Sequence, residues 1–278
     1  MKTKLTFVGA AFVLAATTGI AQADPIRIGT EGAYRPWNFV NEKGELDGFE
    51  IELAKNLCQR LNSECTFIQN SWDGLLPGLD AGRYDVLFSG FAMTASRTET
   101  AGMAGPYAIL AMTFYTVADS PLASADAEGV VSFDRDPKAA EEAIQKMRTL
   151  LTGHTVGVSA SGLSARFVES YFDGSADLKR YRRLDEIDID VSSGRVAAGL
   201  TQLSYATDMI ARTKDVSYKL IGPAFEGGML GQGVGALVAK GNSDLQQKFQ
   251  TVIDEAIKDG TIRELSEKWF SSDMTPVR

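Results

Sequence analysis

The sequence predicts an α/β protein with two lobes, each a mostly parallel β-sheet flanked by helices. The first observation behind this prediction is that strand-like and helix-like segments alternate twice, over residues 26–88 and again after residue 153. Such alternation is typical of parallel sheets with helices on their faces. The second is the length of 278 residues, 44% hydrophobic and 23% charged, which suits two moderate lobes better than one oversized core.

The first alternation has the order strand, helix, strand, helix, strand. Its first strand is β-branched and alternating, and a polar turn at residues 41–45 separates it from a helix whose apolar residues recur at i+3 and i+4. The short second helix is closed by Gly82, a residue type favoured just after a helix. The five elements are expected over residues 26–30, 51–61, 65–69, 72–81 and 84–88.

The middle of the chain begins with a largely apolar, strand-like segment over residues 107–117, which we expect to cross to the second lobe. A polar insertion over residues 122–151 follows and becomes helical over 138–150. The second alternation is then expected as a strand at 154–158, helices near 164–171 and 186–193, a strand at 196–200 and glycine-rich strand sequence at 227–238.

The C-terminal part is predicted to be helical. Ser243 is expected to cap a helix whose apolar residues are Leu245, Phe249, Val252, Ile253 and Ile257. Gly260 should end this helix. Thr261 and Glu264 then form a capping-box pattern that opens a last helix.

The N-terminus has the pattern of an export signal. Lys2 and Lys4 precede an apolar run over residues 5–20, and Ala21-Gln22-Ala23 is a small-x-small cleavage pattern. The alternative, a membrane anchor, needs about 20 apolar residues, and this run is shorter. We therefore expect a signal peptide over residues 1–23, cleavage before Asp24 and an exported mature protein.

The cysteine content agrees with export. Cys58 and Cys65 are the two cysteines of the chain, and their short separation suits a disulfide in an oxidising compartment. The alternative is a pair of buried free thiols.

Composition also excludes several functions. The formal net charge is −8, and without a basic run a nucleic-acid partner is not expected. His154 is the one histidine, so a zinc site and a Ser-His-Asp triad are both implausible. There is no phosphate-binding loop and no dinucleotide fingerprint after the first strand. We expect no cofactor, no metal and no enzymatic activity.

A set of motifs nevertheless resembles a known family. They are Glu31-Gly32-Ala33-Tyr34-Arg35-Pro36-Trp37-Asn38-Phe39, Gly48-Phe49-Glu50-Ile51-Glu52-Leu53, Cys58-x6-Cys65, Trp72-Asp73-Gly74-Leu75-Leu76-Pro77, Gly82-Arg83-Tyr84-Asp85 and Thr94-Ala95-Ser96-Arg97. In order and spacing, the mature chain resembles the family 3 periplasmic solute-binding proteins of ABC transporters, in the polar amino-acid and opine group. The resemblance covers nearly all of the mature chain.

This resemblance implies a type II periplasmic-binding-protein fold, in which two hinge strands join two α/β lobes that close on a ligand. It implies a first lobe of residues 24–115 and 222–278 and a second lobe of residues 118–218. The hinges are then expected near 115–118 and 218–222.

The resemblance also implies binding residues. Arg97 matches the arginine that holds the ligand carboxylate, and its planar fork can grip both oxygens; Thr94 is expected to cap its helix. Tyr34 and Trp72 match aromatic residues that enclose the ligand body. Glu31 matches an acid near the distal part of the ligand. For all four, ordinary core or solvated surface roles are the alternative.

The departures from the family pattern concern the rest of the ligand. Ser89 is retained, whereas Gly90 and Ala92 keep only backbone donors, and Ser161 and Gly162 stand where hydroxyl-bearing residues are usual. Gln202 falls where binders of free amino acids carry an aspartate for the α-ammonium. A primary ammonium favours a carboxylate partner, whereas glutamine suits a secondary amine, a second carboxylate or a sugar hydroxyl. The smaller side chains at Gly90, Ala92 and Gly162 favour a bulkier ligand.

The sequence therefore predicts an opine or opine-like ligand. A free polar amino acid such as arginine or glutamine is the alternative, and a dehydratase that uses Glu31 is a remote one. A membrane ABC permease is the expected partner, and the protein is expected to be a monomer.

Overall fold

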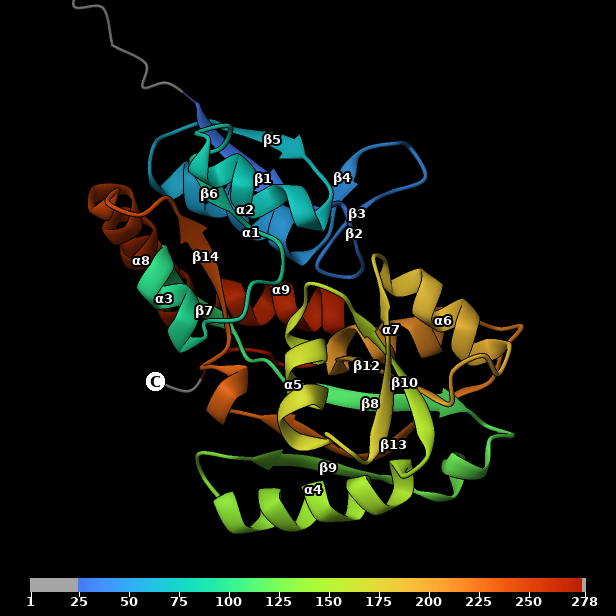
Figure 1. The fold of residues 1–278 in the computed structure, drawn as a ribbon. Coiled ribbons are helices and arrows are strands. Elements are labelled where there is room, and N and C mark those ends of the chain that lie inside the picture. Colours follow the sequence, from blue (N-terminus) through green and yellow to red (C-terminus); the bar gives the residue numbers. More distant parts are fainter. Residues whose placement is uncertain (1–24, 277–278) are drawn as a thin grey trace, which may run out of the picture.

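The computed structural model describes residues 25–276 and has two lobes, the upper and lower halves of Figure 1. The expected signal peptide over residues 1–23 and its cleavage before Asp24 lie outside the described residues. Among the helices of residues 25–276, none is long and apolar enough to cross a membrane.

Lobe 1 is built on a sheet with the strand order β5-β1-β6-β14-β7. Its strands are β1 Ile26–Thr30, β5 Cys65–Gln69, β6 Val86–Leu87, β7 Gly102–Ala108 and β14 Val234–Val238. A second small sheet contains β2 Ala33–Tyr34, β3 Asn38–Val40 and β4 Leu46–Asp47. The helices are α1 Phe49–Arg60, α2 Trp72–Asp80, α3 Ala95–Thr100, α8 Ser243–Lys258 and α9 Thr261–Phe270. Helices α1, α8 and α9 contact one another, while α2 packs on β1 and β6 through a separate apolar cluster.

Lobe 2 is built on a sheet with the strand order β11-β10-β12-β8-β13-β9. Its strands are β8 Met112–Val117, β9 Ala127–Ser132, β10 His154–Ser159, β11 Ala176–Tyr181, β12 Ala198–Gln202 and β13 Tyr218–Glu226. Its helices are α4 Pro137–Leu151, α5 Leu163–Tyr171, α6 Leu184–Ser192 and α7 Leu203–Arg212. Short 3₁₀ turns occur at Pro121–Ser124 and Gly228–Leu230.

The expected α/β fold with two lobes is confirmed, and the sheets are mixed. The pairs β1–β5, β1–β6, β10–β11 and β10–β12 are parallel, as the βα alternations predict. Strands β8 and β14 run antiparallel to both of their neighbours. Each sheet contains both parallel and antiparallel pairs because the chain enters the second sheet through β8 and returns to the first through β14.

The chain crosses between the sheets at residues 109–111 and 227–233. The positions expected for the hinges, near 115–118 and 218–222, instead lie in or beside β8 and β13, which are strands of the second sheet. The apolar run over 107–117 continues through the first crossing, so hydrophobicity does not change where the chain leaves lobe 1. Only the pairing of backbone hydrogen bonds defines the crossing.

Several local expectations also need correction. The strand expected at 84–88 is shorter than predicted, because β6 has two residues. The single strand expected at 107–117 is in fact two strands, the end of β7 and β8, which belong to different sheets. Within 227–238, only β14 is a strand. Asn242, and not Ser243, caps α8, because its side chain accepts from the Leu245 amide at 3.3 Å. The capping box is absent from α9, where Gly260 is the N-cap and the Thr261 hydroxyl donates to Asp259 Oδ1 at 2.7 Å.

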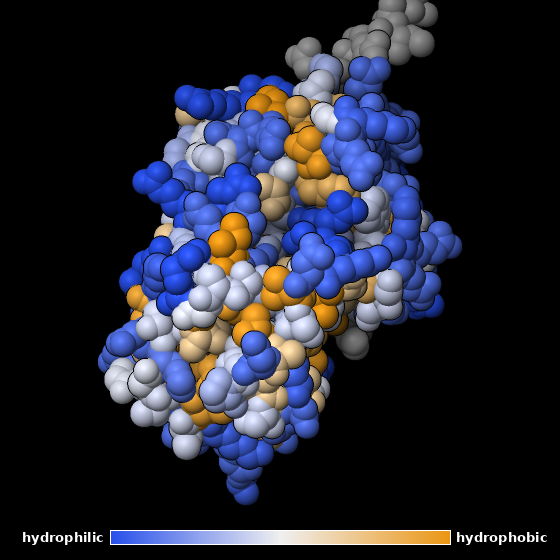
Figure 2. Space-filling model, turned by 90° about the vertical axis from the view of Figure 1, so that its right-hand side faces the viewer, coloured by the Kyte–Doolittle hydropathy of each residue, from blue (hydrophilic) through white to orange (hydrophobic). Residues whose placement is uncertain are grey.

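The disulfide is present and joins Cys58 in α1 to Cys65 at the start of β5. Large apolar side chains fill both lobes. Fully buried aromatic residues include Phe49, Phe88, Tyr107 and Phe249 in lobe 1 and Phe114, Phe167, Phe172 and Phe225 in lobe 2. On the face drawn in Figure 2 the surface is mostly hydrophilic, and hydrophobic residues occur in small scattered groups.

Candidate functional site

A cleft between the two lobes contains most of the predicted site residues. It encloses about 640 Å³ of empty space, including the part open to solvent. From lobe 1 it is lined by Glu31, Tyr34, Trp72, Gly90, Ala92 and Arg97. From lobe 2 it is lined by Met112, Ser159, Gly162, Leu163, Ser164, Arg182, Leu184, Thr201 and Gln202. Many of these residues follow the carboxyl ends of parallel strands, where α/β sheets usually bind ligands.

Two predicted residues, Ser89 and Ser161, do not line the cleft. Ser89 is fully buried, and its hydroxyl accepts a hydrogen bond from the Glu31 amide at 3.1 Å. Ser161 lies on the exposed rim, where its hydroxyl donates to Asp73 Oδ1 at 2.7 Å. Ser89 therefore supports a cleft residue from behind, and Ser161 joins the two lobes.

Arg97 lies in α3 and faces the cleft without a carboxylate partner. Its Nη1 donates to the Ala92 carbonyl at 3.0 Å, and its guanidinium lies 5.1 Å from the centre of the Phe91 ring. Among residues 25–276, no acidic side chain lies within ion-pair distance of it. Burial, with a smaller effect of Arg166, lowers its pKa to about 10. The group is still cationic at neutral pH and can donate further hydrogen bonds to an anion.

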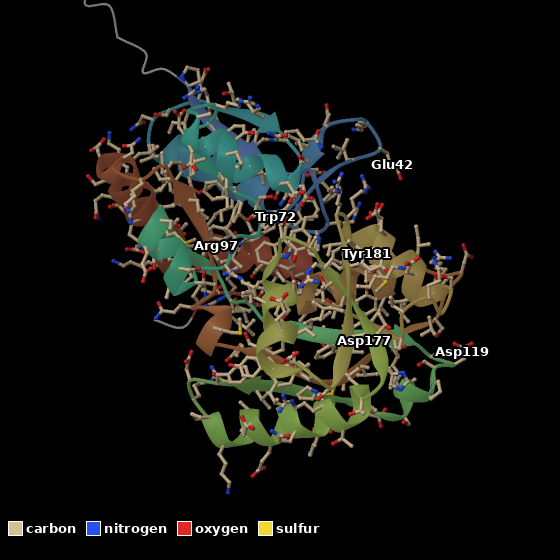
Figure 3. All side chains as sticks on the ribbon, in the orientation of Figure 1. Glu42, Trp72, Arg97, Asp119, Asp177 and Tyr181 are labelled. Carbon is tan, nitrogen blue, oxygen red and sulfur yellow. A yellow bond between two sulfur atoms is a disulfide. The ribbon has the colours of Figure 1, made fainter. Side chains whose placement is uncertain are left out.

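Trp72 supports this end of the cleft from the first residue of α2. Its ring stacks on Phe91 at 4.8 Å between centroids, so Trp72, Phe91 and Arg97 form one layered group. Figure 3 shows Trp72 and Arg97 at the boundary between the lobes. Thr94 is the residue before α3, as expected, but its side chain makes no capping hydrogen bond.

Glu31 follows β1 and carries the acidic side chain of the cleft lining. Burial raises its pKa to about 7, Arg183 opposes the rise, and Asp73 and Asp185 add to it. The carboxyl is therefore poorly stabilised as an anion in the ligand-free cleft. A cationic group placed beside it would favour its ionised form.

Gln202 ends β12 and faces the cleft from lobe 2. Its Nε2 donates to the Gly90 carbonyl at 3.4 Å, which is a long hydrogen bond. Its Oε1 is buried and has no hydrogen-bond partner among the described residues. A buried acceptor without a partner is costly, so this oxygen favours a ligand that brings an N–H or O–H donor.

Gly90 and Gly162 were expected to make room for the ligand, but the structure gives a different reason for glycine at these positions. Gly90 has φ +66°, and a Cβ there would lie 2.7 Å from Cε1 of Tyr34. A Cβ at Gly162 would lie 2.9 Å from the side chain of Ser159. The space beside both glycines is thus occupied by protein atoms, and the interpretation that they make room for a bulkier ligand is wrong.

Tyr34 is held between the lobes. It is buried, and its ring stacks against Tyr205 of α7 at 5.8 Å between centroids. Nearby, the Trp37 indole N–H donates to the Ser204 hydroxyl at 2.9 Å. These contacts connect β2 and the following loop of lobe 1 to α7 of lobe 2, and they describe a closed arrangement of the lobes.

Sequence reasoning missed several lining residues. Arg182 directly follows β11, a strand that the sequence analysis did not predict. Its position just after a parallel strand is a signal that could have identified it. Met112 and Thr201 lie in β8 and β12, within apolar sequence that carries no such signal.

Comparison with known proteins agrees with this geometry. The profile of the bacterial extracellular solute-binding proteins, family 3, matches residues 26–272. The octopine-binding periplasmic protein of Rhizobium meliloti is 36% identical over 99% of this chain and 100% of its own length. The histidine-binding periplasmic protein of Salmonella typhimurium is 31% identical over 95% of this chain and 94% of its own.

Solved structures show the same fold. An ancestral arginine-binding protein bound to glutamine has a TM-score of 0.74 and 27% identity, over 89% of this chain and 98% of that one. A periplasmic His/Glu/Gln/Arg/opine family-binding protein from Silicibacter pomeroyi, in complex with lysine, has a TM-score of 0.71 and 27% identity, over 91% and 100%.

Proposed function

This chain belongs to family 3 of the bacterial extracellular solute-binding proteins, and we propose that it binds an opine or opine-like substituted amino acid. In this proposal it acts in the periplasm as the binding component of an ABC importer. The mature protein begins at Asp24, closes on its ligand by a hinge motion and delivers it, as a monomer, to a membrane permease. The similarity to the octopine-binding relative supports the ligand class.

The observation that carries the proposal is the pairing of Arg97 with Gln202 in one cleft. Arg97 supplies a half-buried cation without an acidic partner among the described residues, which suits a ligand carboxylate. Gln202 supplies a single unpaired acceptor and no charge. A primary ammonium has three donors and a full charge to satisfy, whereas a substituted nitrogen has fewer N–H groups and matches one neutral acceptor better.

Glu31 completes the proposed recognition at the distal end. A cationic group of the ligand, such as a guanidinium, would pair with this carboxyl and draw it into its ionised form. Tyr34 and Trp72 would enclose the intervening apolar part. Charge on the ligand would thus be opposite to that of the cleft at both ends.

A free polar amino acid is the second candidate. It is favoured by the histidine-binding relative and by the arginine-binding structure, which also holds glutamine. Both candidates use Arg97 for the carboxylate and differ at the nitrogen beside Gln202.

Isothermal titration calorimetry separates the two candidates. The protein, freed of any retained ligand by unfolding and refolding, is titrated with octopine, nopaline, arginine, glutamine, histidine and lysine. We expect an opine to bind at least about tenfold more tightly than every free amino acid, a difference of about 1.4 kcal/mol. If free arginine or glutamine binds about tenfold more tightly than every opine, the Gln202 argument is wrong.

A further inference from the structure

A buried carboxylate behind the cleft, that of Glu50, has no role in the contacts described so far. Glu50 is the second residue of α1 and its side chain is fully buried. Oε1 accepts hydrogen bonds from the Gly90 amide at 2.7 Å and from the Tyr107 hydroxyl. Oε2 accepts from Asn38 Nδ2 at 2.6 Å. Among residues 25–276 no cation lies within ion-pair distance of it, so hydrogen bonds and the N-terminal end of α1 provide its stabilisation.

The groups bound to Glu50 come from three parts of lobe 1: Gly90 in the loop after β6, Asn38 at the start of β3 and Tyr107 in β7. Gly90 lines the cleft directly, and its carbonyl accepts from Gln202 of lobe 2. Asn38 reaches the other loop, since its Oδ1 accepts from the Gly32 amide at 2.8 Å, next to Glu31. Glu50 is therefore bonded directly to the loop after β6 and is connected to the loop after β1 through the Asn38 side chain.

A carboxyl group, with an acceptor oxygen on each side, fits the hydrogen-bond directions at this position. The Asn38 amide has its orientation set by the Gly32 N–H, so that its own NH₂ group must face Glu50. The Gly90 N–H is a donor, and the Tyr107 hydroxyl also donates. A glutamine at position 50 would point its NH₂ group at one of these donors. Two buried donors would then face each other without an acceptor between them. Burial without an ion-pair partner is unfavourable for a carboxylate, which argues for a role beyond filling space.

We propose that Glu50 is the positioning residue of the binding cleft. It holds the Gly90 loop and the Glu31–Gly32 loop in one relative arrangement and makes no contact with the ligand itself. Through the Gly90 carbonyl it also sets the direction of the Gln202 amide, whose Oε1 has no hydrogen-bond partner among the described residues. The affinity part of this proposal rests on the proposed function, whereas the loop arrangement does not.

The test uses Glu50→Gln, with Asp190→Asn as a control for loss of a buried carboxylate in the other lobe, one that, unlike Glu50, pairs with Lys179 and Arg195. Asp190 is a buried carboxylate of lobe 2 that also accepts from a tyrosine hydroxyl, that of Tyr181, and it does not line the cleft. Two readouts are used: the Kd of the tightest ligand of the calorimetric panel, and amide hydrogen exchange of residues 30–34 and 88–92 in the ligand-free protein. Thermal melting of each variant reports its loss of stability.

We expect Glu50→Gln to weaken binding at least about tenfold and to speed exchange in both loops. Asp190→Asn should lower Tm but leave both readouts within about threefold of the wild type. The proposal is overturned if Glu50→Gln keeps the protection of both loops and binds within about threefold of the wild type. If the wild type binds no member of the panel, the proposed function fails, and loop exchange alone decides the role of Glu50. Should Glu50→Gln not fold, Glu50→Asp, which shortens the side chain but keeps its charge, is measured with the same expected direction.

Discussion

Ser161 of lobe 2 donates a hydrogen bond to Asp73 of lobe 1 at 2.7 Å, on the rim of the cleft. Asp73 follows Trp72, which lines the cleft, and Ser161 precedes Gly162, which lines it from the other side. The bond joins the two lobes beside the residues that line the cleft, so a hinge motion that opened the cleft here would break it.

Ser161→Ala should therefore speed ligand release. Loss of one exposed hydrogen bond, worth about 1 kcal/mol, corresponds to a dissociation rate about fivefold higher, with little change in Tm. Stopped-flow tryptophan fluorescence, which Trp72 makes sensitive to the cleft, measures the rate. Ser124→Ala is the control, because Ser124 is an exposed serine whose hydroxyl bond stays within lobe 2. An unchanged dissociation rate in Ser161→Ala means that the bond does not contribute to closure.

Arg97→Lys should lose most of the affinity even though the charge is retained. Lysine cannot grip both carboxylate oxygens in one plane, and it would not stack on Phe91 as the guanidinium does. We expect Kd to rise about a hundredfold, and binding of Arg97→Ala to fall below detection by calorimetry. Arg180→Ala is the control, because Arg180 is exposed and pairs with Glu169 within lobe 2. Near-normal affinity in Arg97→Ala would remove Arg97 from the site.

Glu31→Gln should stabilise the ligand-free protein above neutral pH. The folded-state pKa of Glu31 is raised from 4.5 to about 7, so between these values the folded state holds a proton that the unfolded state has released. Ionisation therefore costs stability as pH rises from 4.5 to about 7, and above that the cost is complete, on the order of 3 kcal/mol. Urea unfolding at about pH 5 and pH 8 should show a gain for Glu31→Gln that is larger at the higher pH.

The same substitution should weaken binding of a ligand with a cationic distal group, because the neutral amide cannot pair with it. For the wild type, affinity for such a ligand should rise with pH through about 7, as Glu31 becomes ionised. Glu42→Gln is the control, because Glu42 lies in an exposed turn at the edge of lobe 1 (Figure 3). Parallel pH profiles of stability for the wild type and Glu31→Gln would contradict this account.

Gln202→Asp should shift selectivity toward free amino acids. The new carboxylate would pair with a primary ammonium, whereas the present neutral acceptor favours a substituted nitrogen. We expect the ratio of the Kd values for arginine and for the tightest opine to fall by about tenfold or more. Gln202→Asn has the length of aspartate without its charge, and it should leave that ratio nearly unchanged. Equal ratios in the two variants would show that charge at position 202 does not select the ligand.

Replacing Cys58 and Cys65 together by serine should lower the free energy of unfolding by about 2.5 kcal/mol, the chain-entropy value for a loop of this length. The bond joins α1 to β5 and lies away from the cleft lining. Urea unfolding with and without reductant measures the effect. The wild type should lose stability in reductant, and the double variant should not respond. A wild type that is insensitive to reductant would contradict a stabilising role.

Much of the fold could be read from local patterns. The β1–α1–β5–α2 sequence, helices α4 and α5 and strand β10 follow from periodicity of apolar residues, because that periodicity reports which face of an element is buried. Strand β9 was missed because most of its residues are exposed and do not alternate. Strand β11 was missed although its first four residues alternate between half-buried and exposed, because this alternation is short. Helix α7 was missed as well, although its hydrophobic residues face one side.

The site was predictable where the sequence matches motifs of the resembled family. Arg97, Trp72, Tyr34 and Glu31 all line the cleft, and each was expected there because of that resemblance, since residue type alone also allows a core or surface role. Arg182, Met112 and Thr201 come from strands β11, β8 and β12, and their convergence depends on how the second sheet is ordered.

The sequence by itself predicted the two α/β alternations and a possible disulfide pair, and its resemblance to a known family predicted the cation that lines the cleft. Tertiary structure alone decided where the chain crosses between the sheets, why Gly90 is a glycine and which loops Glu50 joins. The physical reason is that the periodicity of apolar residues and the type of each residue indicate only whether a position is buried or charged. Hydrogen bonds between residues 40 to 112 positions apart, such as Gly90 to Glu50 and Gln202 to Gly90, record which buried surfaces meet.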